Sequence, residues 1–140
     1  MKKIFAFFLT IVLCNIGYAL EKIPQDVANS YKLIGVEKTL IGVAEGMMST
    51  QGKMVDDITQ FISASASGKT ISLTYKIYQR KNEINIDQVQ LKILKKSIPL
   101  ICKSPLSNFL IYDMDAKFTV NYYDVNNMFL FRFNFSSTNC

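Results

Sequence analysis

The stretch FTVNYYDVNNMFLFRFNF, residues 118–135, decides the fold. Its first six residues alternate apolar or aromatic side chains with more polar ones, and its last seven place phenylalanine at every second position. A period of two is typical of strands with one buried face. Asp124 to Asn127, between the two runs, favour a tight turn. The stretch therefore predicts a β-hairpin whose second strand turns four phenylalanines toward the core: Phe129, Phe131, Phe133 and Phe135.

A second hairpin is predicted upstream. Residues 55–64 form its first strand, and Ala66 to Lys69 form its turn, because small residues and glycine gather there. From Thr70 to Tyr78, apolar side chains alternate with polar ones, as expected of a half-buried strand.

Two helices are predicted between the hairpins. Asn85 can cap the first of them. Pro99 is expected to kink or end this helix near Ser97, because proline removes one backbone hydrogen bond. A short second helix begins at Ser104-Pro105. The apolar positions of the two helices are Leu91, Leu94, Ile98 and Cys102, followed by Leu106, Phe109 and Leu110.

Residues 27–48 form an apolar segment near the N-terminus. The pattern favours a helix with a wide apolar stripe. Three glycines weaken that prediction, so two short strands at 32–36 and 39–44 are the alternative. Apolar residues recur there every seven positions, at Val27, Ile34, Ile41 and Met48.

Together these elements predict an α+β domain. We expect a four-stranded antiparallel sheet made of the two hairpins, with the helices packed on one face and one disulfide. The single domain spans residues 20–140, with an N-terminal apolar helix segment at 20–53 and a sheet–helix core at 54–140.

Residues 1–19 have the pattern of a cleavable secretory signal. Two lysines precede an apolar run at positions 4–13, and small residues stand at Gly17 and Ala19. The run is too short for a membrane span, which needs about 20 apolar residues. We expect cleavage after Ala19 and a periplasmic or secreted mature protein without a transmembrane segment.

Cys14 gives an alternative N-terminus, a lipid-modified cysteine. Leu13 stands before it, where a lipoprotein signal normally has a small residue. Signal cleavage after Ala19 is therefore the favoured prediction.

Removal of the signal leaves two cysteines, Cys102 and Cys140. Outside the cytoplasm, a single pair is expected to form a disulfide. Closing a loop of about 38 residues stabilises the fold by roughly 4 kcal/mol in the chain-entropy model. The chain has no Cys-x-x-Cys motif and no histidine to activate a thiol, which argues against a redox role.

Composition excludes several kinds of function. The absence of histidine removes Ser-His-Asp and Cys-His catalysis as well as histidine metal sites, so no metal or cofactor is expected. The mature chain has 14 basic and 11 acidic residues, and its charge of +3 is spread along the sequence. A nucleic-acid-binding protein would need a concentrated basic face. The nearest basic group fits the solvent side of a helix better: Lys92, Lys95, Lys96 and Lys103.

A few polar groups could carry chemistry. Asp113 with Asp115, or the Ser65–Lys69 region, could serve a small histidine-free hydrolase. Asp56-Asp57 is a second acidic pair, and both pairs fit solvated loop carboxylates better than a calcium site. Ser67 to Thr70 resembles the end of a phosphate-binding loop, but a strand rather than a helix is predicted to follow, so a hairpin turn is favoured.

The tyrosines offer a more general function, recognition of another protein. Tyr78 and Tyr123 fall on the polar faces of their predicted strands, and Arg132 occupies a polar position on the last strand. Exposed aromatic and arginine side chains are enriched at protein interfaces. These three residues form the candidate interaction surface.

Residues 54–140 resemble small exported bacterial proteins of uncharacterised function. The shared pattern includes an apolar strand like Ile71 to Ile77, a helix that ends in Cys102 before Lys103-Ser104-Pro105, and a terminal Cys140. An aromatic strand like Phe118 to Tyr123 completes it. The resemblance implies the fold and the disulfide but no activity. Secretion-system pilot proteins, which are lipoproteins, also pair a small α+β domain with a disulfide.

The sequence thus favours an exported, non-enzymatic binding module whose partner is another protein. An immunity protein, an enzyme inhibitor and a secretion accessory protein all fit. The alternatives are the hydrolase above, a carrier of a small apolar ligand, and a lipoprotein secretion pilot if Cys14 is lipidated.

Overall fold

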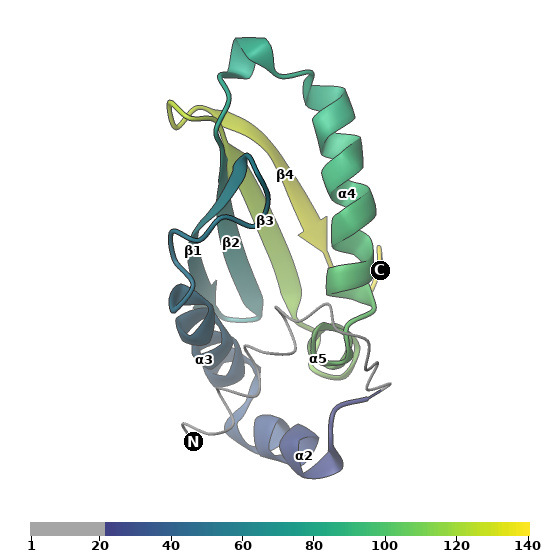
Figure 1. Cartoon of the computed structure of the whole chain (residues 1–140). Helices are drawn as coiled ribbons and strands as arrows, with labels where there is room; N and C mark the ends of the chain where they lie inside the picture. Colours follow the sequence, from purple (N-terminus) through teal and green to yellow (C-terminus); the bar gives the residue numbers. More distant parts are fainter. Residues whose placement is uncertain (1–21) are drawn as a thin grey trace.

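The computed structural model describes residues 22–140 as one layer of β-sheet with helices on one face (Figure 1). The predicted signal peptide, with Cys14 and Ala19, lies outside the described residues. The α+β prediction is confirmed. In chain order the elements are α2 (Gln25–Ile34), α3 (Val36–Met48), β1 (Thr59–Ser67), β2 (Thr70–Ile77), η1 (Lys81–Glu83), α4 (Ile86–Cys102), α5 (Pro105–Asn108), the π-helical turn η2 (Phe109–Asp113), β3 (Lys117–Tyr123) and β4 (Phe129–Phe135).

The sheet has the strand order β1-β2-β3-β4. Both predicted hairpins are present as antiparallel pairs, β1 with β2 and β3 with β4. The central pair, β2 with β3, is parallel, which is the one departure from the all-antiparallel sheet that the sequence predicts. The reason is the connection: α4 runs back along the sheet, so β3 starts at the same end as β2 (Figure 1).

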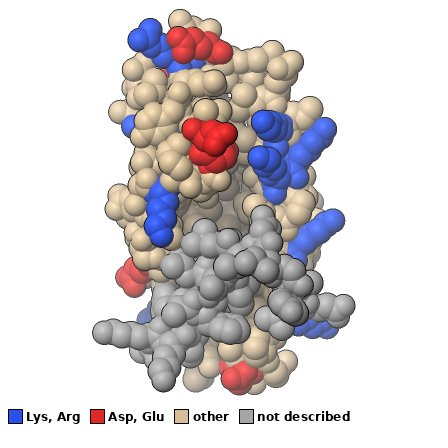
Figure 2. All heavy atoms as spheres, viewed as in Figure 1, with Lys and Arg blue, Asp and Glu red and all other residues tan. Residues whose placement is uncertain are grey.

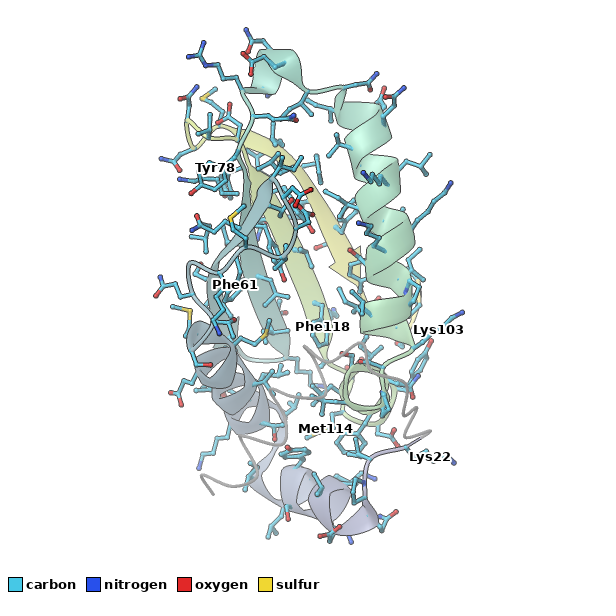
Figure 3. The ribbon with its side chains drawn as sticks, in the orientation of Figure 1. Lys22, Phe61, Tyr78, Lys103, Met114 and Phe118 are labelled. Carbon is cyan, nitrogen blue, oxygen red and sulfur yellow. A yellow bond between two sulfur atoms is a disulfide. The ribbon has the colours of Figure 1, made fainter. Side chains whose placement is uncertain are left out.

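The sheet face that the helices cover, here called the inner face, holds the main core. Ile71, Leu73 and Ile77 of β2 lie there, next to Phe118 and the rest of its row on β3. Side chains fill the space between this face and the helices (Figure 3). Burying a large apolar side chain stabilises a fold by about 1.5–3 kcal/mol, so this face supplies most of the stability.

A β-bulge corrects the prediction for β4. Tyr122 pairs with Phe131, but the next pair is Tyr123 with Phe129, so Leu130 is an extra residue in the strand. Since one extra residue reverses the alternation, Phe129 turns to the opposite face and is 44% exposed. Only three of the four predicted phenylalanines face the core: Phe131, Phe133 and Phe135.

The N-terminal segment is helical, as favoured, but forms two helices instead of one. Gly35 separates α2 from α3, with φ 87° and ψ 160°. Essentially only glycine adopts this backbone conformation. Leu40, Val43 and Ala44 of α3 are buried, and the helix packs mainly on β1.

The middle helix continues past Pro99. Asn85 caps α4 by accepting a hydrogen bond from the Gln88 amide, and the helix runs through Pro99 to Cys102. Of the two outcomes predicted at Pro99, a kink or an end near Ser97, the end is therefore wrong. Pro99 and Lys95, whose carbonyl loses its partner, both lie on the exposed side of the helix, where water can satisfy that carbonyl.

The predicted disulfide is confirmed. Cys102, at the end of α4, is bonded to Cys140, with 5.3 Å between their Cα atoms. The bond holds the end of the chain, beyond β4, against the end of α4.

Candidate interaction surfaces

The sheet face opposite the helices, here called the outer face, is covered by no helix of the described chain. Because successive side chains of a strand point to opposite faces, every second residue belongs to the outer face. This alternation shifts by one residue at two bulges, in β1 between Phe61 and Ser63 and in β4 at Leu130. Its side chains are mainly hydroxyls and amides, with three aromatic and three basic residues. From the pairing register they are Gln60, Ser63, Ser65, Ser67, Thr70, Ser72, Thr74, Lys76, Tyr78, Lys117, Thr119, Asn121, Tyr123, Phe129, Arg132 and Asn134.

Tyr78, Tyr123 and Arg132 all lie on this outer face. Tyr78, at the end of β2 (Figure 3), is 47% exposed, and its hydroxyl donates to Gln60 Oε1 at 2.7 Å. Tyr123 is half-buried and pairs across the sheet with Lys76 on one side and Phe129 on the other. The predicted residues thus share one surface.

Phe129 links Tyr123 to Arg132. The Tyr123 and Phe129 rings meet edge to face, with centroids 5.7 Å apart. The Arg132 guanidinium lies over the Phe129 ring, 5.9 Å from its centroid, within the range of a cation–π interaction. Sequence reasoning missed Phe129, because alternation without the bulge places it in the core.

Asn121 fixes the position of Arg132. The Arg132 Nε donates to Asn121 Oδ1 at 2.6 Å, and Asn121 Nδ2 donates to the Leu73 carbonyl at 3.3 Å. Asn121 is buried although it lies on the polar face. Hydrogen bonding on both sides of a buried amide holds the guanidinium at a defined place.

The inner face carries a row of aromatic rings that crosses all four strands. It runs from Phe61 on β1 (Figure 3) through Tyr75 and Tyr122 to Phe131 on β4. Neighbouring ring centroids are 5.5, 5.3 and 4.9 Å apart. Such pairs contribute about 0.5–1.5 kcal/mol each beyond the area that they bury.

The two tyrosines of this row place their hydroxyls away from bulk water. Burial raises the pKa of Tyr75 to about 12. Burial is the largest cause of a raised pKa at Tyr122, and the charge of Tyr75 and, to a smaller extent, that of Asp56 raise it further. A hydrogen bond with the Ser97 side chain acts in the opposite direction and lowers the pKa. Ser97 belongs to α4 and Asp56 to the segment before β1, so groups from two sides of the inner face converge on Tyr122.

The helix over this row is only partly packed. Of the seventeen residues of α4, Cys102 alone is buried. Leu91 is 54%, Ile98 39% and Leu100 52% exposed. Five apolar residues of α4 pack partly against the core: Ile86, Val89, Ile93, Leu94 and Ile101.

Helical spacing explains this exposure. At 100° per residue, the apolar residues of α4 cover an arc of about 220°, whereas about 100° suffices for a helix that packs on a core. At the two edges of the arc, Val89 is half-buried and Cys102 is buried. Leu91 and Ile98 lie on one flank, and Leu100 lies on the other. Basic side chains gather over α4 (Figure 2). By helical spacing, three lysines lie outside the arc: Lys92, Lys95 and Lys96.

Apolar side chains are also exposed in the segment before β1: Met54, Val55 and Ile58. Asp56, which lies among them, accepts from the Ile58 and Thr59 amides and so shapes the turn into β1. The segment leads directly into β1, the strand at one edge of the sheet.

The groups weighed for catalysis do not form a buried site. Asp115 pairs with Lys69 at 3.1 Å, and both side chains are more than half exposed. Ser65 and Ser67 lie on the outer face, and the turn between β1 and β2 leads into a strand rather than a helix. Within residues 22–140, no three His, Cys, Asp or Glu side chains are grouped so that they could hold a metal ion.

None of the described helices is long and apolar enough to cross a membrane.

Comparison with known proteins gives structural similarity alone. No protein-family model and no curated protein match the sequence. Among solved structures, the chain is similar to a secreted protein of Pseudomonas aeruginosa, with a TM-score of 0.65 and 12% identity over 75% of this chain and 92% of that one.

Two further structures are pilotins of type II secretion systems. The Vibrio vulnificus pilotin has a TM-score of 0.63 at 10% identity, over 75% of this chain and 91% of that one. The Vibrio cholerae pilotin has a TM-score of 0.59 at 11% identity, over 81% of this chain and 98% of that one. At these identities the likeness establishes a shared fold.

Proposed function

We propose that this protein is an exported, non-enzymatic accessory protein that binds a protein component of a secretion system through α4. The observation that carries the proposal is the apolar arc of α4, twice as wide as packing on the sheet requires, with one buried residue in seventeen. The fold shared with two secretion pilotins supports the same function. Export, cleavage after Ala19 and the periplasmic or secreted location are parts of this proposal.

The partner segment is expected to be apolar and helical. An amphipathic helix can lay its apolar side against the flanks of α4 and the exposed apolar residues before β1, in the manner of helix-in-groove recognition. Both flanks are exposed in the free protein, so binding would remove Leu91, Ile98 and Leu100 from water. The lysines beside them favour a partner with acidic residues next to its apolar stripe.

The test is capture of the channel-forming subunit of a type II secretion system by the purified mature protein. Replacing Leu91, Ile98 and Leu100 together by serine is expected to weaken binding by about tenfold or more, because burial of one such side chain is worth about 1.5–3 kcal/mol. The midpoint of urea unfolding should change little, since these side chains are exposed. Leu33→Ser on α2 is the matched control, because Leu33 is 88% exposed and lies far from α4 in the sequence. Equal binding by the triple variant and the wild type would contradict the proposal.

Export has its own test, the intact mass of the protein purified from the periplasm. We expect the mass of residues 20–140, less the two hydrogens lost in forming the Cys102–Cys140 bond. A chain that begins at a lipidated Cys14 would instead make the protein a membrane-tethered lipoprotein pilot.

A further inference from the structure

The outer face differs from the rest of the surface in its charge. Its basic residues are Lys76, Lys117 and Arg132, and its sixteen side chains include no carboxylate. The one ion pair among the described residues joins Lys69 to Asp115 in the loops, not on the face. Like charges repel a second copy of the same surface, so the charge of the face favours an acidic partner over self-association.

Aromatic groups are concentrated at one end of this face. Gln60, Lys76, Tyr123 and Phe129 form one cross-strand row, and Tyr78 lies beside it, hydrogen-bonded to Gln60. Aromatic rings and arginine, as Arg132 beside Phe129, are enriched at protein interfaces relative to the rest of a protein surface. The other end of the face, by contrast, carries mainly serine and threonine.

The register places two cations on either side of Tyr123. Lys76 pairs directly with Tyr123, and Arg132 pairs with Asn121, two residues earlier on β3. Arg132 therefore lies two strands from Lys76 and two residues along the sheet. With strands about 4.8 Å apart and a rise of about 3.3 Å per residue, their Cα atoms are separated by about 12 Å.

Arg132 is prepared for a carboxylate. Its Nε is already engaged by Asn121 and its Cζ lies over the Phe129 ring, which leaves the two terminal nitrogens of the guanidinium without a hydrogen-bond partner among the described residues. A fixed guanidinium loses less entropy when it forms charge-assisted hydrogen bonds.

We infer that this end of the outer face binds an extended, acidic segment of a partner protein. Two carboxylates about four residues apart would reach Lys76 and Arg132, because four extended residues span about 13 Å. An apolar side chain between them would lie on Tyr123 and Phe129. The inference does not rest on the proposed function, since it uses the opposite side of the sheet from α4, and it would make the protein an adaptor with two separate binding faces.

The test uses NMR chemical-shift mapping of the full mature protein with a synthetic heptapeptide. The probe has glutamate at its second and sixth positions, phenylalanine at its fourth and serine elsewhere. We expect the largest shifts at the amides of Lys76 and Tyr123 and at the Arg132 Nε–H. A peptide with lysine in place of both glutamates should cause no such shifts, and one with the glutamates adjacent should bind several-fold more weakly.

Two variants keep the test independent of folding. Lys76 makes no hydrogen bond or ion pair with another described side chain, so Lys76→Gln should fold normally and weaken peptide binding by about fivefold, the size expected of one exposed charge-assisted contact. Lys95→Gln on α4 removes the same charge elsewhere and should leave binding unchanged.

Three results of the peptide experiments would overturn the inference. They are shifts centred on the α4 lysines, equal effects of Lys76→Gln and Lys95→Gln, and an absence of shifts at millimolar peptide. The same shifts are measured with vesicles of phosphatidylglycerol and with polygalacturonate. Larger shifts on the outer face with either of these than with the peptide would also reject a protein partner, in favour of a lipid surface or an anionic glycan. Capture of the secretion channel through α4 can succeed or fail independently of every one of these results.

Discussion

At the residue scale, Asp124 shows how one side chain organises a turn. It is 1% exposed. Its Oδ1 accepts from the Asn126 and Met128 amides, both at 2.8 Å, and its Oδ2 accepts from the Lys81 amide at 2.9 Å. The carboxylate therefore holds the turn between β3 and β4 and also joins that turn to η1, 43 residues away in the chain.

Hydrogen bonding outweighs burial in setting the pKa of Asp124. Burial alone would raise the pKa, whereas the amides of Met128, Lys81 and Asn126, together with the charge of Lys81, lower it below its ordinary value of 3.8. A carboxyl whose pKa is lower in the folded state stabilises the fold fully above its ordinary pKa, and that contribution is lost as the pH falls through the folded-state value.

We expect Asp124→Asn to lower the urea concentration at the midpoint of unfolding at pH 7. The side-chain nitrogen of the new asparagine cannot accept a hydrogen bond, so it would face the Lys81 N–H or another donor that the carboxylate now binds. The difference from the wild type should shrink as the pH falls through the lowered folded-state pKa of Asp124, because the wild-type carboxyl becomes protonated there. Urea unfolding at a series of pH values from 7 downward measures the effect. Asp115→Asn, at an exposed carboxyl paired with Lys69, is the control and should change the midpoint much less. A pH-independent difference for Asp124→Asn would show that its charge does not matter.

At the scale of elements, a single glycine decides that the N-terminal segment is two helices. Gly35 serves as the C-cap of α2 and the N-cap of α3, and its amide donates to the Tyr31 carbonyl. A Cβ at Gly35 would meet no atom within 4 Å, so backbone conformation alone requires glycine there. The break lets α3 place Leu40, Val43 and Ala44 against the sheet at its own angle.

We expect Gly35→Ala to cost about 3 kcal/mol of unfolding free energy, the upper end for a strained backbone. Gly68, in the turn between β1 and β2, has φ 59° and also has open space around it. Because other residues tolerate that left-handed conformation, Gly68→Ala should cost only about 1 kcal/mol. Chemical denaturation of both variants provides the comparison, and equal costs would mean that Gly35 can relax without strain.

At the scale of the whole molecule, the disulfide ties the lightly packed α4 to the sheet. It joins residues 38 apart, so the ring that it closes contains α5, η2, β3 and β4. Before the other end of α4, the Lys81 amide of η1 donates a hydrogen bond to the Asp124 carboxylate in the turn between β3 and β4. The chain is thus held near both ends of α4 while the middle of the helix stays half-exposed, as the proposed binding through α4 requires.

Replacing both cysteines by serine is expected to lower the free energy of unfolding by roughly 4 kcal/mol in the chain-entropy model. Equilibrium unfolding of the double variant, compared with the oxidised wild type, measures the loss. The reduced wild type serves as a control that should behave like the double variant. A loss below about 1 kcal/mol would show that the ends of α4 are held without the bond.

Local patterns in the sequence determined the two hairpins, the start of α4 at Asn85, the pairing of the two cysteines and the polar position of Tyr78, Tyr123 and Arg132. Each depends on residues close in the chain, or on the count of cysteines. Alternation gives the face of a strand, and capping chemistry gives the start of a helix, before any distant contact forms.

Only the tertiary structure decided how these pieces meet. The parallel pairing of β2 with β3 depends on the path of α4, and the bulge at Leu130 depends on the fit of β4 against β3. These long-range fits brought Phe129 between Tyr123 and Arg132 and left both flanks of α4 exposed. The physical reason is that periodicity states which side of an element is apolar, whereas burial also depends on how much of that side its neighbours can cover.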